Sequence, residues 1–158
     1  MAFLALGGAC GRETNAPGTL RVLLVRPPHD TVRFAARARA HRCARGRGIL
    51  ALGVARGNGA LVWVRSRDSL DGAYPLLARG DSTTVSGAMV SVRFVVGPDA
   101  RGVTLDSGAV TLTRLPRAVA AQVDGSGLDP VSGVRVGVRL RVVAAPLDAD
   151  TVSCELRL

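Results

Sequence analysis

Apolar and polar residues alternate with a period of two along long stretches of this chain. The clearest stretch is 134–144, where valines and a leucine alternate with arginine and glycine. Residues 31–43 alternate in the same way, with valine, phenylalanine and alanine on one side and mostly arginine on the other. This period predicts half-buried β-strands, because successive side chains of a strand point to opposite faces. Alanine and arginine also favour helices, so a helix is the alternative for 31–43, but the regular alternation favours a strand.

Short apolar runs bounded by turn-forming residues fill the rest of the chain. The sequence Arg56-Gly57-Asn58-Gly59 predicts a hairpin, because Asn-Gly adopts the positive φ angles of tight turns. A turn is also expected at 97–102, and Pro75 makes the short run 73–77 a candidate edge strand. About eight or nine strands are expected, which predicts an all-β fold, either an antiparallel β-sandwich or a small β-barrel. The main segments are 19–25, 31–43, 49–54, 60–65, 83–96, 109–113, 118–128, 134–144 and 151–158.

Length and composition indicate one folded domain with a strongly basic charge. The chain has 158 residues, 47% of them apolar, which is enough for a single core and too apolar for intrinsic disorder. Its formal net charge is +9, and all 21 basic residues are arginine. The excess lies between Thr31 and Arg67, where arginines occur without an acidic residue.

This basic stretch has two interpretations. It is either a solvated strand face or a surface for anionic glycans or lipid head groups. No aromatic platform accompanies the arginines, so nucleic-acid binding is not expected. The candidate face consists of Arg33, Arg37, Arg39, Arg42, Arg45 and Arg47.

The amino terminus resembles the end of a bacterial lipoprotein signal. Residues 1–9 read M-A-F-L-A-L-G-G-A and precede Cys10 directly. The run is short, has no basic region before it, and places Gly7 where such signals usually have leucine. The resemblance implies a lipid on Cys10 and export to the bacterial cell envelope, in the periplasm or at the outer membrane surface; a frayed apolar terminus is the alternative. Residues 1–18 would be the signal remnant and a polar tether, followed by one β domain over 19–158.

The three cysteines predict one disulfide. An odd number is unusual in an exported protein, but lipidation of Cys10 leaves Cys43 and Cys154 to pair. The bridge would close a loop of about 110 residues and contribute about 4–5 kcal/mol on the chain-entropy relation. Two separate buried thiols are the alternative. Because Cys43 is out of phase with the apolar face of its strand, a bulge near Arg42 is expected to turn it inward.

A second resemblance involves the last sixty residues and, more loosely, Cys10. The strand Asp106-Ser107-Gly108-Ala109-Val110-Thr111-Leu112-Thr113-Arg114, a following strand with Asp124-Gly125-Ser126-Gly127, and then a long amphipathic strand are similar to small uncharacterised bacterial lipoproteins. The resemblance implies a β-sandwich or lipocalin-like barrel in the cell envelope. It assigns no catalytic residues.

No residue pattern points to catalysis, a cofactor or a metal. His29 and His41 are the only histidines, and neither stands in a recognisable triad. The cysteines lack further ligands at zinc spacing, and Asp68, Asp71 and Asp81 lack calcium-loop spacing.

The function predicted first is therefore that of a non-enzymatic envelope protein, a binding or structural module attached to the membrane through Cys10. The second interpretation is a carrier of a small apolar ligand, with a barrel interior lined by valine, leucine, Phe34 or Trp63. The third is a module that binds anionic glycans or lipids through the basic face.

Overall fold

The fold is described from a computed structural model, which covers residues 16–28, 30–45 and 47–154. These residues form ten strands, and none of them lies in a helix, so no helix in this part of the chain could cross a membrane. The all-β prediction is confirmed. The strands are β1 (Thr19–Arg26), β2 (Asp30–Cys43), β3 (Gly48–Ala55), β4 (Asn58–Arg65), β5 (Gly72–Pro75), β6 (Gly87–Val96), β7 (Asp99–Thr104), β8 (Ser107–Leu115), β9 (Ala118–Leu128) and β10 (Arg135–Val152).

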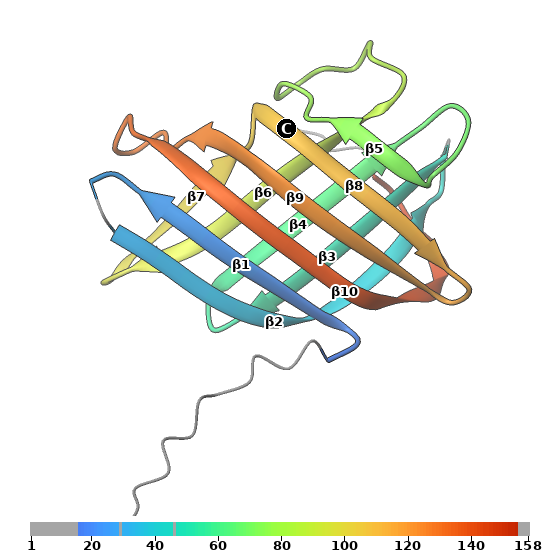
Figure 1. Cartoon of the computed structure of the whole chain (residues 1–158), viewed down its shortest axis with the longest axis horizontal. Helices are drawn as coiled ribbons and strands as arrows, with labels where there is room; N and C mark the ends of the chain where they lie inside the picture. Colours follow the sequence, from blue (N-terminus) through green and yellow to red (C-terminus); the bar gives the residue numbers. More distant parts are fainter. Residues whose placement is uncertain (1–15, 29, 46, 155–158) are drawn as a thin grey trace, which may run out of the picture.

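The strands form one sheet that folds over into two layers. Their order is β5-β8-β9-β10-β1-β2-β3-β4-β6-β7, and neighbouring strands are antiparallel. The sheet ends at β5 and β7, so Pro75 lies in an edge strand as predicted. In Figure 1, β5, β8, β9, β10 and β1 form the layer nearer the viewer, called the front layer here, and β3, β4, β6 and β7 form the back layer. The long strand β2 curves from one layer to the other.

The core fills the space between the two layers. Alternation places every second side chain inside, as in β10, where Val136, Val138, Leu140 and Val142 are at most 2% exposed. The back layer contributes Val62, Val64, Val90, Val92 and Phe94. Burying a side chain of this size contributes about 1.5–3 kcal/mol, so this double row of valines and leucines holds the layers together.

The strand β10 is longer than the sequence pattern predicts. Alternation ends at Ala144, and the pattern predicts a separate strand at 151–158; instead β10 continues to Val152, and residues 155–158 lie outside the described part of the chain. The register with β9 shifts between Val142 and Ala145, where Ala144 has a φ of 44°. This irregularity interrupts the period without ending the strand.

Two turns also differ from the predictions. The hairpin between β3 and β4 turns at Arg56 and Gly57, which have φ angles of 51° and 81°, while Asn58 pairs with Ala55 as the first residue of β4. The Asn58 side chain accepts a hydrogen bond from the Val95 backbone at 2.9 Å instead. The turn expected at 97–102 contains only two residues, because β7 already begins at Asp99.

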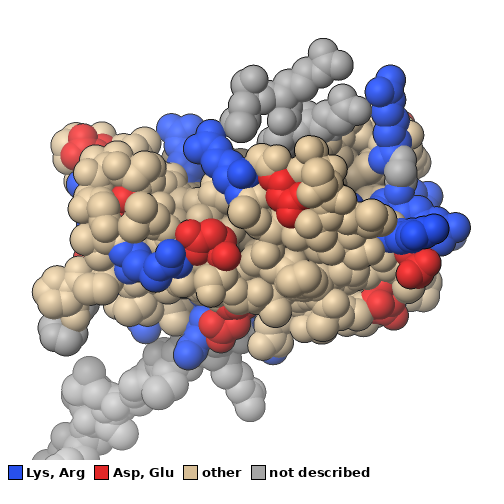
Figure 2. All heavy atoms as spheres, turned by 90° about the horizontal axis from the view of Figure 1, so that it is seen from above, with Lys and Arg blue, Asp and Glu red and all other residues tan. Residues whose placement is uncertain are grey.

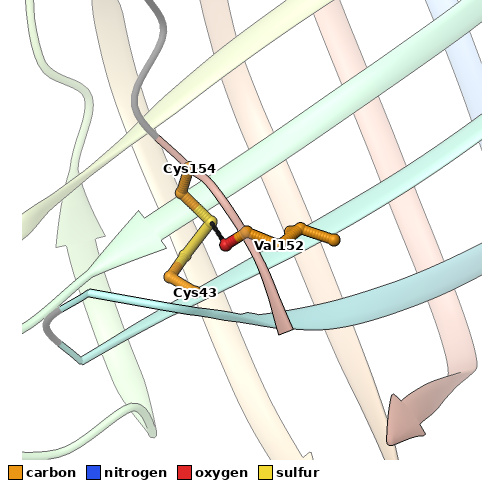
Figure 3. The surroundings of a disulfide bond; sticks show 3 residues. All are labelled: Cys43, Val152 and Cys154. Atoms are coloured by element: carbon orange, nitrogen blue, oxygen red, sulfur yellow. Dashed lines mark hydrogen bonds between the residues drawn. A yellow bond between two sulfur atoms is a disulfide. The ribbon is translucent and has the colours of Figure 1, made fainter. Parts of the chain in front are cut away.

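The predicted disulfide between Cys43 and Cys154 is present (Figure 3). The end of β10 runs parallel to β2 and pairs Val152 with Cys43. The expected bulge near Arg42 is absent, because β2 keeps one register with β3 from Ala38 to Arg42. The register shift lies in β10 instead, between Leu147 and Thr151.

Cys43 therefore stays out of phase with the core face of β2. Its sulfur lies beside Gly48, where an added Cβ would be 2.6 Å from it. It lines a small outer pocket together with Trp63 and Arg65, both of which point away from the core. Cys43 is buried because the end of β10 covers it, and not because its strand turns it inward.

Candidate functional site

The outer face of the back layer is apolar over its middle, although it points away from the core. Along β4, Val62 and Val64 lie in the core, so the residues that alternate with them point outward. Cross-strand pairing places these outward residues beside those of β3 and β6. The apolar floor formed in this way consists of Leu52, Leu61, Trp63 and Met89.

This floor belongs to a groove of about 1050 Å³ that crosses β3, β4, β6 and β7. Small-molecule sites typically enclose about 300–1,000 Å³, so this groove has room for a small or elongated ligand. The Ser91 and Thr104 hydroxyls form a hydrogen bond of 3.0 Å at one side. The polar and charged residues at the margins are Asn58, Arg65, Arg79, Asp81, Ser82, Ser91, Arg93 and Thr104.

The loop between β5 and β6 lines the groove and is held in place by Asp81. The Asp81 carboxylate accepts hydrogen bonds from the backbone and hydroxyl groups of Thr83 and Thr84. These bonds, led by that from the Thr84 hydroxyl, lower the pKa of Asp81 to about 2. They also explain why residues 83–86, predicted as strand, form a loop. Arg65 ties the loop to β4, because its guanidinium donates to the Asp81 carbonyl at 2.8 Å.

Two donors at this site have no hydrogen-bond partner among the described residues. They are Nε1 of Trp63 and Nε of Arg65, and both atoms are buried. The Arg65 guanidinium lies over the Trp63 ring, 5.7 Å from its centroid. Buried donors are almost always paired, so these two atoms are exceptions, and their burial keeps them out of direct reach of a ligand in the groove.

The margins of the groove carry an excess of positive charge. Arg65 lies 3.6 Å from the Asp81 carboxylate. Arg79 and Arg93 are exposed, and neither has an ion-pair partner within the described ranges. A ligand with an apolar body and an acidic group therefore matches both the floor and the margin.

The arginines of the predicted basic face do not lie together in the structure. Arg33 and Arg37 are exposed on the outer face of the front layer. Arg39 lies on the same side of β2, but its guanidinium is 3.6 Å from the Asp148 carboxylate. That carboxylate also lies 3.6 Å from Nε2 of His41.

The other three arginines of this face lie at the end of β2 and in the following turn. Arg42 is exposed and pairs with Ile49, a core residue, so it lies on the other side of β2 from Arg37 and Arg39. The Arg47 guanidinium donates to the Asp68 backbone carbonyl at 2.6 Å. Arg45 is exposed and engaged in a contact. The six arginines do not form one continuous surface.

The carrier interpretation predicts a barrel interior lined by valine, leucine, Phe34 or Trp63. Phe34 packs against the core, whereas Trp63 lies on the outer face of the back layer. The groove around Trp63 is thus an external site. Cys10 and His29 lie outside the described residues, so lipidation of Cys10 remains a prediction.

Sequence reasoning named only Trp63 among the residues of this floor. A signal was present in 49–54, which is apolar at nearly every position. A strand without polar alternation has apolar side chains on both faces. In β3, the outward side chain of Leu52 does line the groove.

The described residues contain no group of three or more His, Cys, Asp or Glu side chains placed to hold a metal ion. No protein-family model matches the chain, and no curated protein or solved structure shows significant similarity to it.

Proposed function

We propose that this chain is an exported, non-enzymatic binding protein of the bacterial cell envelope, anchored through a lipid on Cys10. Its ligand lies in the groove on the outer face of the back layer. The observation that carries the binding role is the apolar floor of that groove, because apolar surface on the outside of a domain marks an interaction site. The disulfide supports export, since such bonds persist in oxidising compartments.

The ligand is an amphiphile with an apolar body and one acidic group. The floor contacts the apolar body, and burial of each CH₂ group contributes about 0.8 kcal/mol. Arg79 and Arg93, both exposed, attract the acidic group from the margin. This proposal moves the predicted carrier site from the barrel interior to the outside of the sheet.

Calorimetric titration with sodium laurate, below its micelle threshold, tests the proposal. The full chain should bind laurate with saturable, near-stoichiometric heat. The variant Leu61→Ala removes three carbons from the half-buried floor and should weaken binding about 5- to 30-fold. The matched control is Leu23→Ala, which removes the same atoms from a half-buried outer position of the front layer and should leave laurate affinity unchanged.

The acidic group is tested separately with dodecanol, which has the same chain length and no charge. Arg93→Gln should weaken laurate and leave dodecanol unaffected, because only laurate gains from the positive margin. Equal loss in Leu61→Ala and Leu23→Ala, or no saturable binding by the unaltered chain, would contradict the groove as the ligand site.

Export and anchoring are tested by intact-mass analysis of protein produced with its full upstream region. The expected mass includes a lipid on Cys10 and the loss of two protons for one disulfide. An unmodified Cys10 in membrane-free protein would contradict the anchor, and this result is independent of ligand binding.

A further inference from the structure

The outer face of the front layer brings together arginines from the consecutive strands β1 and β2 and from β10, which is distant in the sequence. Strand β1 lies between β10 and β2, at the side of the front layer where β2 curves towards the back layer (Figure 1). Arg21 of β1 lies opposite Arg141 of β10. Two residues further along β1, Leu23 lies between Arg139 of β10 and Arg33 of β2.

This arrangement places like charges closer together than a stable sheet prefers. Directly opposed side chains have Cβ atoms about 5 Å apart and diagonal neighbours about 7–8 Å, and opposed like charges destabilise a sheet. Arg21 has one arginine opposite it and Arg33, Arg37 and Arg139 on its diagonals. An anionic partner would relieve this repulsion between the arginines.

Among the described residues, acidic side chains compensate little of the charge of Arg33, Arg139 and Arg141, while Arg21 is engaged in a further contact. Asp124 is the one acidic residue among the described residues that line the groove beside these arginines, and it lies 3.5 Å from Arg139 with both side chains about three-quarters exposed. Exposed ion pairs of this kind are weak. The rim of the sandwich seen from above in Figure 2 differs, because basic and acidic side chains are interspersed there.

The cluster lies in a groove of about 960 Å³. The outward side chains that line it contain no aromatic ring, so it lacks the stacking surface on which single-stranded nucleic acids depend. Its one larger apolar side chain, Leu23, is half-buried on the floor and is not placed to insert into a bilayer. The outward side chains that line this groove are those of Arg21, Leu23, Arg33, Ala35, Gln122, Asp124, Arg139 and Arg141.

We propose that this arginine groove binds a linear anionic glycan, a polysaccharide chain that carries carboxylate or sulfate groups. Guanidinium groups pair with such anions through two parallel hydrogen bonds, and a concave groove suits a chain better than a flat membrane surface. The site lies on the opposite outer face from the groove of the proposed function, so either site can fail without the other.

Fluorescence anisotropy with a labelled heparin oligosaccharide of defined length tests the proposal on the full chain. Binding should be measurable at low salt and should weaken steeply as salt rises, because charge dominates the contact. The double variant Arg33→Gln/Arg141→Gln should weaken binding at least about tenfold, since it removes two charge-assisted contacts. The matched control, Arg114→Gln/Arg117→Gln, changes the net charge equally at two exposed positions, one near the end of β8 and one in the turn before β9, and should weaken binding less than about twofold.

The variant Arg33→Lys/Arg141→Lys covers the case in which the glutamine variant is misfolded. It keeps both charges but loses the paired hydrogen bonds, so its affinity should fall between those of the native chain and the glutamine variant. An equal loss in the test and control pairs would overturn the site. Absence of heparin binding at low salt, or tighter binding to phosphatidylglycerol vesicles or single-stranded DNA than to heparin, would overturn the glycan assignment.

Discussion

Removing the Cys43–Cys154 disulfide is expected to cost the domain much of its stability. The bridge joins cysteines that are 111 positions apart, so it restricts the unfolded chain over most of the domain. The chain-entropy relation gives about 4.8 kcal/mol for a loop of this size. For a domain of about 140 residues this corresponds to a fall of about 15 °C in Tm.

Loss of the bridge should increase local opening most at the end of β10, which has few backbone hydrogen bonds to its neighbour. The end of β10 pairs with β2 at only three positions, with a register shift between the first and second, and Ala44 donates one further backbone hydrogen bond to Val152 at 2.8 Å. Without the bridge, amide exchange at 147–152 should accelerate more than in β1, which is paired along both edges.

Thermal unfolding followed by circular dichroism measures the prediction. All proteins carry Cys10→Ser to exclude thiol exchange, and Cys43→Ala/Cys154→Ala is compared with the parent in its oxidised and dithiothreitol-reduced forms. The reduced parent keeps the sulfur atoms and loses only the cross-link, so it separates chain entropy from packing. A Tm difference below about 3 °C between oxidised and reduced parent would refute the entropic reasoning.

Further predictions concern single side chains. The Asp129 carboxylate is fully buried and accepts hydrogen bonds from Val131, Ser132 and Arg101. In urea unfolding, Asp129→Ala should therefore lower the free energy of unfolding by about 3 kcal/mol or more. A loss below about 1 kcal/mol would contradict the role of these bonds. Burial disfavours the charge on Asp129, but the bonds led by that from Ser132 outweigh burial and lower its pKa below 3.8. Its contribution is therefore complete above that value and lost as pH falls through the lowered pKa, so acid should shift the urea midpoint of the native chain more than that of Asp129→Ala. Gly108 has a φ of 120°, and an added Cβ would collide with the Asp124 carbonyl. Gly108→Ala should therefore lower the free energy of unfolding by about 3 kcal/mol. An unchanged urea midpoint would contradict this close approach of β8 to β9.

The sequence predicts the strands well because their cause is local. Alternation and turn residues identify β1, β2, β4 and β9 to within about two residues. Predictions fail where the cause is tertiary, as at Ala144, where a register shift breaks the period inside β10. The disulfide was predictable from cysteine number, but the side of β2 on which Cys43 lies depends on how β10 returns to cover it.

The sites were harder to predict because both are assembled across strands. The arginine groove needs β1 between β10 and β2, and nothing in the local pattern places Arg21 opposite Arg141. The ligand groove needs the outward faces of β3, β4 and β6 side by side. The sequence shows which residues face outward on each strand, but not which strands are neighbours.

Emission from Trp63 tests the location of the ligand most directly, because it is the chain's single tryptophan and lies on the groove floor. Laurate that enters the groove replaces water around the indole ring, so its emission should shift to shorter wavelength and saturate at the affinity measured by calorimetry. The shift should require correspondingly more laurate in Leu61→Ala and be unchanged in Leu23→Ala. Laurate binding in the calorimeter without any change in Trp63 emission would place the ligand elsewhere and contradict the proposed function.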